Sequence, residues 1–155
     1  MANPKLNALA LARLRGQEAA QAEPAAAAAT AQGPRPIAAI IADLSRHLPE
    51  RHIRTRTQGG IVIPYIEWHT AVKYLDHFAP GWCSEVRALT AIGGRCVVVV
   101  RLTLPTAEGP VWREATGAED EEVKGYGDPS SNAEAMALKR AAAKFGLGLY
   151  LYAAK

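Results

Sequence analysis

Three basic side chains, Lys139, Arg140 and Lys144, lie close together near the end of the 155-residue chain. No acidic residue lies among them, so no neighbour along the chain neutralises their charge. Lysine and arginine side chains bind phosphate groups through charge-assisted hydrogen bonds. The cluster is typical of a surface that binds a polyanion. It is equally typical of an ordinary solvated helix face, and these residues alone do not separate the two interpretations.

A helix predicted over residues 131–145 would position these cations. Ser131 and Glu134 have the spacing of a capping box and follow Asp128-Pro129 directly, which is typical of a helix start. On a helical wheel at about 100° per residue, small residues and Leu138 form one narrow face. The three cations lie on the opposite side. We therefore expect one face to pack against a sheet and the other to remain free for binding.

The other elements follow from the spacing of apolar and glycine residues. Apolar residues recur at helical spacing over 37–44 and 68–78. Segments rich in strand-forming residues flank two glycine pairs, Gly59-Gly60 and Gly93-Gly94, which are typical of tight hairpin turns. The predicted strands cover residues 51–58, 61–66, 82–92, 95–104 and 110–117. This order predicts an α+β domain, in which an antiparallel β-hairpin and a three-stranded meander pack with helices on one face.

Two regions of the chain differ in composition. Residues 1–36 are an Ala-rich N-terminal extension, which we expect to be flexible apart from a short helix after Asn3-Pro4, and residues 37–155 form the predicted folded domain. The chain has only two cysteines, Cys83 and Cys96, and no apolar run near the roughly 20 residues that span a bilayer. We therefore expect no disulfide framework, no membrane partner and a reducing, cytoplasmic location.

The net charge of +3 is distributed unevenly along the chain. Basic segments lie on both sides of residues 119–131, whose charges sum to −4. Such segregation favours a local cationic surface for a polyanion. The consecutive carboxylates of Glu119, Asp120, Glu121 and Glu122 do not point at a common centre, as a metal-dependent nuclease would require. We expect them to form a solvated loop.

Two longer segments resemble a known family. GYGDPSSNAEAMALKRAAAKFGLGLYLY, with its A-L-K-R-A-A-x-K-F-G core, and RTQGGIVIPYIEWHTAVKYLDHFAPGWCSEV are similar to the single-strand annealing proteins of the Rad52 superfamily, which include DdrA-like and Sak-like bacterial and phage members. The resemblance extends from about Arg51 to Tyr152, some two thirds of the chain. It implies a ring-forming fold in which a cationic groove holds the phosphate backbone of one strand and leaves its bases exposed.

The resemblance also implies which residues bind DNA. Lys139 and Arg140 match the groove-lining basic pair, and either Arg54 or Arg56 matches a further groove arginine. A third base of the family falls at Ala143 here, and whether the following Lys144 replaces it is left open. Tyr65 lies beside these elements, and an aromatic ring there would stack on bases.

The function implied is binding of single-stranded DNA and annealing of complementary strands in homologous recombination and double-strand break repair. The implied protein is a homo-oligomeric ring without ATP, cofactor or catalytic residue, in a bacterial or phage-host cytoplasm and associated with the nucleoid. Contact with a recombinase or a single-strand-binding protein, the number of subunits, the biological setting and the role of residues 1–36 are left open. The resemblance does not settle whether the setting is phage recombination, chromosomal repair or protection of DNA ends.

Other chemistry finds less support in the sequence. The four candidate metal ligands, His69, His77, Cys83 and Cys96, lack the close spacing of a zinc site. No glycine-rich nucleotide loop is present, so an ATP-driven recombinase is disfavoured. The main alternative is a double-stranded RNA-binding module, which also ends in an Ala-rich basic helix but carries its lysines at the helix N-terminus. A metal-dependent nuclease and a purely structural oligomer are the remaining alternatives.

Overall fold

The computed structural model describes residues 33–122, 125 and 127–153, and the residues from Pro34 onward form one compact unit. Arg35 and Pro36, which the sequence placed in the N-terminal extension, belong to this unit. The rest of the predicted extension lies outside the described residues. Within the described part of the chain, no helix is long and apolar enough to cross a membrane.

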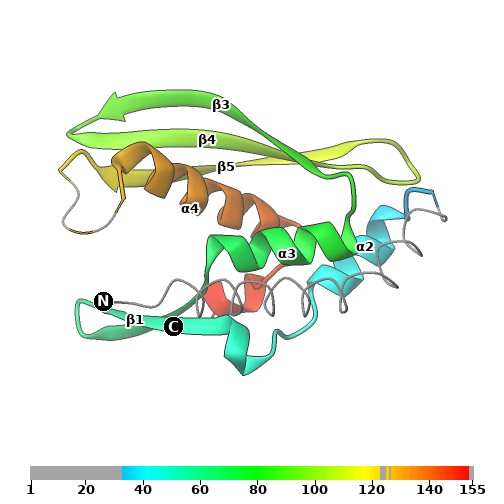
Figure 1. The fold of residues 1–155 in the computed structure, drawn as a ribbon. Helices are drawn as coiled ribbons and strands as arrows, with labels where there is room; N and C mark the ends of the chain where they lie inside the picture. The colour runs from blue at the N-terminus through cyan, green and yellow to red at the C-terminus, as the bar shows by residue number, and fades with distance from the viewer. Residues whose placement is uncertain (1–32, 123–124, 126, 154–155) are drawn as a thin grey trace, which may run out of the picture. The chain divides into compact units, whose positions relative to one another are not determined.

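In the part of the chain that the structure describes, five strands form two separate antiparallel sheets (Figure 1). The first sheet is a hairpin of β1 (Ile53–Gln58) and β2 (Ile61–Ile66), and the second is a meander of β3 (Cys83–Ile92), β4 (Arg95–Leu104) and β5 (Val111–Asp120) in that order. Both glycines of each pair have positive φ, +58° and +77° in the first turn and +57° and +74° in the second. Such angles suit the tight turns that match strand twist, which is why glycine stands there.

Among the described residues, three α-helices accompany the sheets: α2 (Ile37–Leu44), α3 (Trp68–Phe78) and α4 (Pro129–Lys144). Short 3₁₀ turns, η1 (Glu50–His52) and η2 (Leu149–Tyr152), precede β1 and follow α4. Figure 1 shows α4 along one face of the meander, with α3 on the side of α4 away from that sheet. The predicted α+β architecture, with a hairpin, a meander and helices on one face, is confirmed.

The core lies between the meander and α4. Side chains of β4 alternate between buried and half-buried positions, and the buried set faces α4. The helix contributes only small side chains where it approaches most closely, including Ala133 and Ala137, both fully buried. A Cβ on Gly117 of β5 would lie 1.9 Å from the Ala133 carbonyl oxygen and 2.6 Å from the Ala137 nitrogen. The helix backbone therefore lies directly against β5, at a distance that only glycine permits.

The start of α4 differs from the predicted capping box. Asp128 is the N-cap, and its Oδ1 accepts a hydrogen bond from the backbone N–H of Ser131 at 3.0 Å. Hydrogen bonds from the hydroxyl of Ser130 and from the N–H and hydroxyl of Ser131 hold the pKa of Asp128 well below its usual range. Pro129 occupies the first turn, where its missing N–H costs nothing. The helix begins two residues earlier than predicted because the Asp128 side chain caps it and Pro129 is tolerated in its first turn.

Only the second half of the acidic run matches the predicted solvated loop, since Glu121 and Glu122 are exposed and follow β5. Glu119 and Asp120 continue β5, where they lie opposite Cys96 and Arg95 of β4. Asp120 also forms an ion pair with Arg95, with 3.2 Å between Oδ1 and Nε. Cross-strand pairing thus extends the strand beyond the predicted end at residue 117, because β4 offers partners that local sequence does not reveal.

A β-bulge between Val86 and Ala88 shifts the β3–β4 register by one residue. Without a bulge, the Gly93-Gly94 turn would place Ala91 opposite Cys96 and Leu104 opposite Cys83. Ala91 does lie opposite Cys96, but Cys83 lies opposite Thr103. Both cysteines are free, Cys83 exposed and Cys96 buried.

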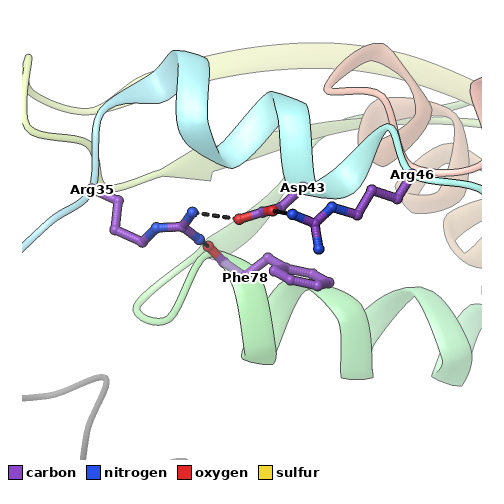
Figure 2. A network of polar contacts seen from close by, with 4 residues as sticks. All are labelled: Arg35, Asp43, Arg46 and Phe78. Carbon is purple, nitrogen blue, oxygen red and sulfur yellow. Dashed lines mark hydrogen bonds and ion pairs between the residues drawn. The ribbon is translucent and has the colours of Figure 1, made fainter.

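A polar network joins the start of the unit to α2 and α3 (Figure 2). Arg35 donates hydrogen bonds to the Asp43 carboxylate and to the Phe78 carbonyl oxygen, the latter at 3.3 Å. Arg46 pairs with the other Asp43 oxygen at 2.8 Å. The hydrogen bond from Arg35 is the main cause that lowers the pKa of Asp43. The network holds the first residues of the compact unit against the C-terminal end of α3.

Candidate nucleic-acid interface

The hairpin β1–β2 and the helix α4 carry the predicted binding residues. Arg54 lies opposite Tyr65 across the hairpin, and Arg56 lies opposite Ile63. Because side chains alternate between the two faces of a strand, Arg54, Arg56 and Tyr65 share one face of the hairpin. Lys139 of α4 lies near this same face, because its Nζ approaches the ring of Tyr65.

Two cations approach the ring of Tyr65. The Lys139 Nζ lies 5.4 Å from the ring centroid and the Arg56 Cζ lies 5.9 Å from it. Both distances are within the range of cation–π attraction. Tyr65 and Lys139 are half-buried, whereas Arg56 is exposed. The structure therefore brings together Arg56 and Lys139, which are 83 positions apart in sequence. Of the two candidate arginines, Arg56 approaches the ring.

The positive charge at Tyr65 is not neutralised. Within the described part of the chain, neither Arg56, Lys139 nor Arg140 forms an ion pair. Burial lowers the pKa of Lys139, repulsion from Arg56 and Arg140 lowers it further, and Glu67 acts in the opposite direction. A group of cations that repel one another and lack carboxylate partners is a favourable site for an anion.

Arg140 and Lys144 lie on the β5 side of α4, not on a face opposite the sheet as the helical wheel predicted. The Arg140 Nη1 donates a hydrogen bond to the Thr116 carbonyl oxygen at 3.0 Å, and the Lys144 Nζ donates to the Glu114 carbonyl oxygen. Both cations line a pocket of about 300 Å³. Ala143, the position of the family's third base, is buried but also lines this pocket.

Two residues near this site were missed by the sequence interpretation. Tyr152 of η2 lines the same pocket. Desolvation raises the pKa of Tyr152, and the nearby positive charges of Arg140 and Arg56 oppose that rise, so the phenol lies close to both arginines. Glu67 forms an ion pair with Arg54, with 3.5 Å between Oε2 and Nε. The LYLY motif after α4 was the only sequence signal for Tyr152, and it has no periodicity that sets it apart.

No metal centre is evident in the part of the chain that the structure describes, where no three side chains of His, Cys, Asp or Glu gather. His69 instead lies 3.4 Å from a Glu67 oxygen. Cys83 and Cys96 lie at different positions along the β3–β4 ladder.

Comparison with known proteins assigns the chain to a family. Residues 36–155 match the family described as Rad52/22 family double-strand break repair protein. The chain belongs to this family. It is 43% identical over 120 residues to DNA repair RAD52-like protein 1, mitochondrial, of Arabidopsis thaliana, and 37% identical over 122 residues to DNA repair RAD52-like protein 2, chloroplastic, of the same plant. Each match covers 76% of this chain, and they cover 68% and 61% of the two relatives.

Membership of the Rad52/22 family gives the chain a role in DNA repair and recombination. The predicted superfamily is thereby confirmed. The predicted bacterial or phage-host cytoplasm is wrong, because the two relatives are plant proteins named for the mitochondrion and the chloroplast. Neither relative supports a DdrA-like or Sak-like subtype, and the sequence motifs shared across the superfamily do not distinguish its branches.

Proposed function

We propose that this Rad52/22 family chain binds single-stranded DNA along the face formed by Arg56, Tyr65, Lys139 and Arg140, and that it anneals complementary strands. The observation that carries the proposal is the convergence of cations without ion-pair partners on the ring of Tyr65. A phosphate placed there would relieve the repulsion that lowers the pKa of Lys139, so binding gains from charge that the free protein leaves unbalanced.

The proposed contacts go to the DNA backbone. Neutralising phosphates releases counterions, so the affinity is independent of sequence and falls with salt. Contacts to phosphate and sugar leave base edges free to pair, as annealing requires. The Tyr65 ring stacks on a base or sugar, and such stacking tolerates any sequence. Arg54 and Lys144 extend the cationic surface on either side of the central cluster.

The proposed active form is an oligomer. Every residue of the edge strand β3 is exposed, and Val86, Leu89 and Ile92 are each more than half exposed. The hairpin exposes two more large apolar side chains, Ile61 and Val62. Edge strands with exposed apolar residues pair readily with other chains. A head-to-tail contact between copies closes into a ring when its rotation allows, and the ring multiplies weak phosphate contacts.

The proposed mechanism uses no ATP, metal or other cofactor, because holding phosphates while leaving bases exposed lowers the barrier to pairing without covalent chemistry. Nucleic-acid binding alone would also fit a double-stranded RNA module. The first turn of α4 carries no cation, however, and its basic residues follow two turns later. That position does not match the phosphate-binding end of such a helix.

Three measurements on the purified chain test the proposal. Fluorescence anisotropy with homopolymeric and mixed-sequence oligonucleotides should give similar affinities that fall linearly with log salt. Annealing of complementary oligonucleotides should be accelerated in EDTA and without nucleotide. Electron microscopy should show closed rings. Preference for double-stranded RNA, cleavage of DNA with magnesium, or annealing by a stable monomer would each contradict the corresponding part of the proposal.

A further inference from the structure

A second basic surface lies beside the proposed groove. A pocket of about 190 Å³ is lined by residues of η1, β1 and α3 and by Glu67, which directly precedes α3. This pocket shares Arg54 with the hairpin face. None of its other lining residues belongs to the Tyr65 cluster, by which we mean Arg56, Tyr65, Lys139 and Arg140. The basic groups that line it are Arg51, His52, Arg54, His69 and Lys73.

The fixed charges of this pocket are unbalanced. Three permanent cations, Arg51, Arg54 and Lys73, face a single carboxylate, Glu67, which leaves a net charge of +2 with neutral histidines. Glu67 is already engaged by Arg54 at 3.5 Å and by His69 at 3.4 Å. Among the residues that the structure describes, neither Arg51 nor Lys73 has an ion-pair partner. Two cations from different elements therefore remain available for an anion.

Hydrogen-bonding groups are held in place around the same pocket. The His52 Nδ1 lies 2.9 Å from the Tyr74 hydroxyl oxygen, and the two rings meet edge to face. Arg51 is close enough to Tyr74 for its charge to act on the phenol. Thr70 lines the pocket and is buried. These contacts fix the side of the pocket formed by η1 and α3 and reduce the ordering that a ligand would otherwise have to impose.

The volume limits what the pocket can hold. At about 30 Å³ per water molecule, 190 Å³ corresponds to roughly six waters. Pockets that enclose whole drug-sized ligands begin at about 300 Å³. A phosphate group with its oxygens fits this space, whereas a complete nucleotide would extend beyond it.

We propose that the pocket bounded by Arg51, Arg54 and Lys73 is a phosphate-binding subsite, separate from the Tyr65 cluster, that takes a phosphate of a DNA strand lying in the groove. Arg54 connects the two sites, because it lies opposite Tyr65 across the hairpin and also lines the pocket. The assignment of the phosphate to DNA rests on the function proposed above. The assignment of the pocket to phosphate does not.

The first experiment uses inorganic phosphate as the probe and therefore needs no DNA. The ring signals of His52 and His69 are followed by NMR during a phosphate titration of the full chain. We expect saturable shifts of both histidines. The shifts should be lost in Arg51→Gln/Lys73→Gln and retained in Arg46→Gln/Arg87→Gln, which removes the same two charges outside both sites. The absence of saturable shifts in the parent, or unchanged shifts in the pocket variant, would overturn the subsite.

The second experiment identifies the source of the phosphate. Affinities are compared for oligonucleotides that end in 5′-phosphate, 3′-phosphate or hydroxyl. If the pocket takes an internal phosphate, Arg51→Gln/Lys73→Gln should flatten the slope of log affinity against log salt by about 0.7 for each phosphate that the variant no longer neutralises, with all three ends alike. If it takes a terminal phosphate, the parent should favour that end and the variant should not. If phosphate shifts the histidine signals but the chain binds no DNA, the phosphate subsite is supported and the proposed DNA-binding groove is rejected. If the pocket variant has the same salt slope as the parent and the parent binds all three oligonucleotides equally, the pocket does not bind a phosphate of DNA.

Discussion

Replacing Lys139 and Arg140 together by alanine removes both α4 cations that lie nearest to Arg56. Each phosphate that a protein neutralises on single-stranded DNA contributes about 0.7 to the slope of log affinity against log salt. The double replacement should therefore flatten the slope by about 1.4 for each subunit that binds the strand. When the salt concentration rises fourfold, the affinity of the variant should therefore fall by a factor about seven times smaller than that of the parent. The decrease in affinity should be similar for every sequence, because phosphates are the same in all of them.

The fold should survive this double replacement. Arg140 is exposed and Lys139 is half-buried, while the close contact of α4 with β5 is made by Ala133 and Ala137. The variant loses the cation–π contact with Tyr65, worth roughly 0.5–1 kcal/mol at exposed sites. It also loses the repulsion with Arg56 that lowers the pKa of Lys139, which offsets part of that cost. The thermal transition should therefore change little.

The assay is fluorescence anisotropy of a labelled oligonucleotide over a series of salt concentrations, with circular dichroism to verify folding. Arg46→Ala/Arg95→Ala is the matched control, because it removes two cations that lie neither in a proposed site nor in the β3 edge. This control should lower the affinity only slightly and leave the slope unchanged. A folded Lys139→Ala/Arg140→Ala variant with the parent slope would refute the assignment of these residues to the groove.

Four further outcomes are expected. Gly117→Ala should lower the free energy of unfolding by about 1–3 kcal/mol in urea titrations, because its Cβ overlaps the Ala133 carbonyl; parent stability would contradict the close approach of α4. DNA affinity should fall as pH rises through the lowered pKa of Lys139, below the ordinary 10.5, because phosphate binds the ammonium form. Lys139→Arg should remove this dependence in anisotropy titrations, since arginine stays charged. Deleting residues 1–34 should leave the thermal transition nearly unchanged, as Arg35 and its network remain; a large decrease would disprove the predicted domain boundary. Leu89→Glu should reduce the mass seen by light scattering and the annealing rate together while the domain stays folded, and a monomeric variant that anneals as fast as the parent would exclude the role of the β3 edge.

Elements with strong local signals were predictable from the sequence. Gly59-Gly60 and Gly93-Gly94 fixed both hairpins, because few other residues adopt positive φ at two successive positions. The apolar spacing over 68–78 located α3 to the residue. Helical geometry placed both Lys139 and Arg140 opposite the packing face, but only Lys139 points toward the hairpin, because Arg140 donates a hydrogen bond to a carbonyl oxygen of β5.

Features decided by tertiary contacts were not predictable. The bulge between Val86 and Ala88 and the extension of β5 to Asp120 depend on pairing with β4. Which arginine approaches the Tyr65 ring also depends on tertiary contacts, since Arg54 pairs with Glu67 whereas Arg56 lies near the ring. The phosphate-sized pocket draws residues from three elements. No periodicity within one segment can reveal such a combination.

The Ala-rich character of α4 also links packing to binding. Small residues in a helix are often taken as low complexity, but Ala133 and Ala137 let the helix backbone lie against Gly117 of β5. A larger side chain at any of these three positions would push α4 away from the meander and toward the hairpin and α3, which lie on its other side. The 5.4 Å between Lys139 and the Tyr65 ring depends on that spacing. Variants of this packing face should therefore alter DNA affinity as well as stability, although none of the three residues contributes a charge to the groove.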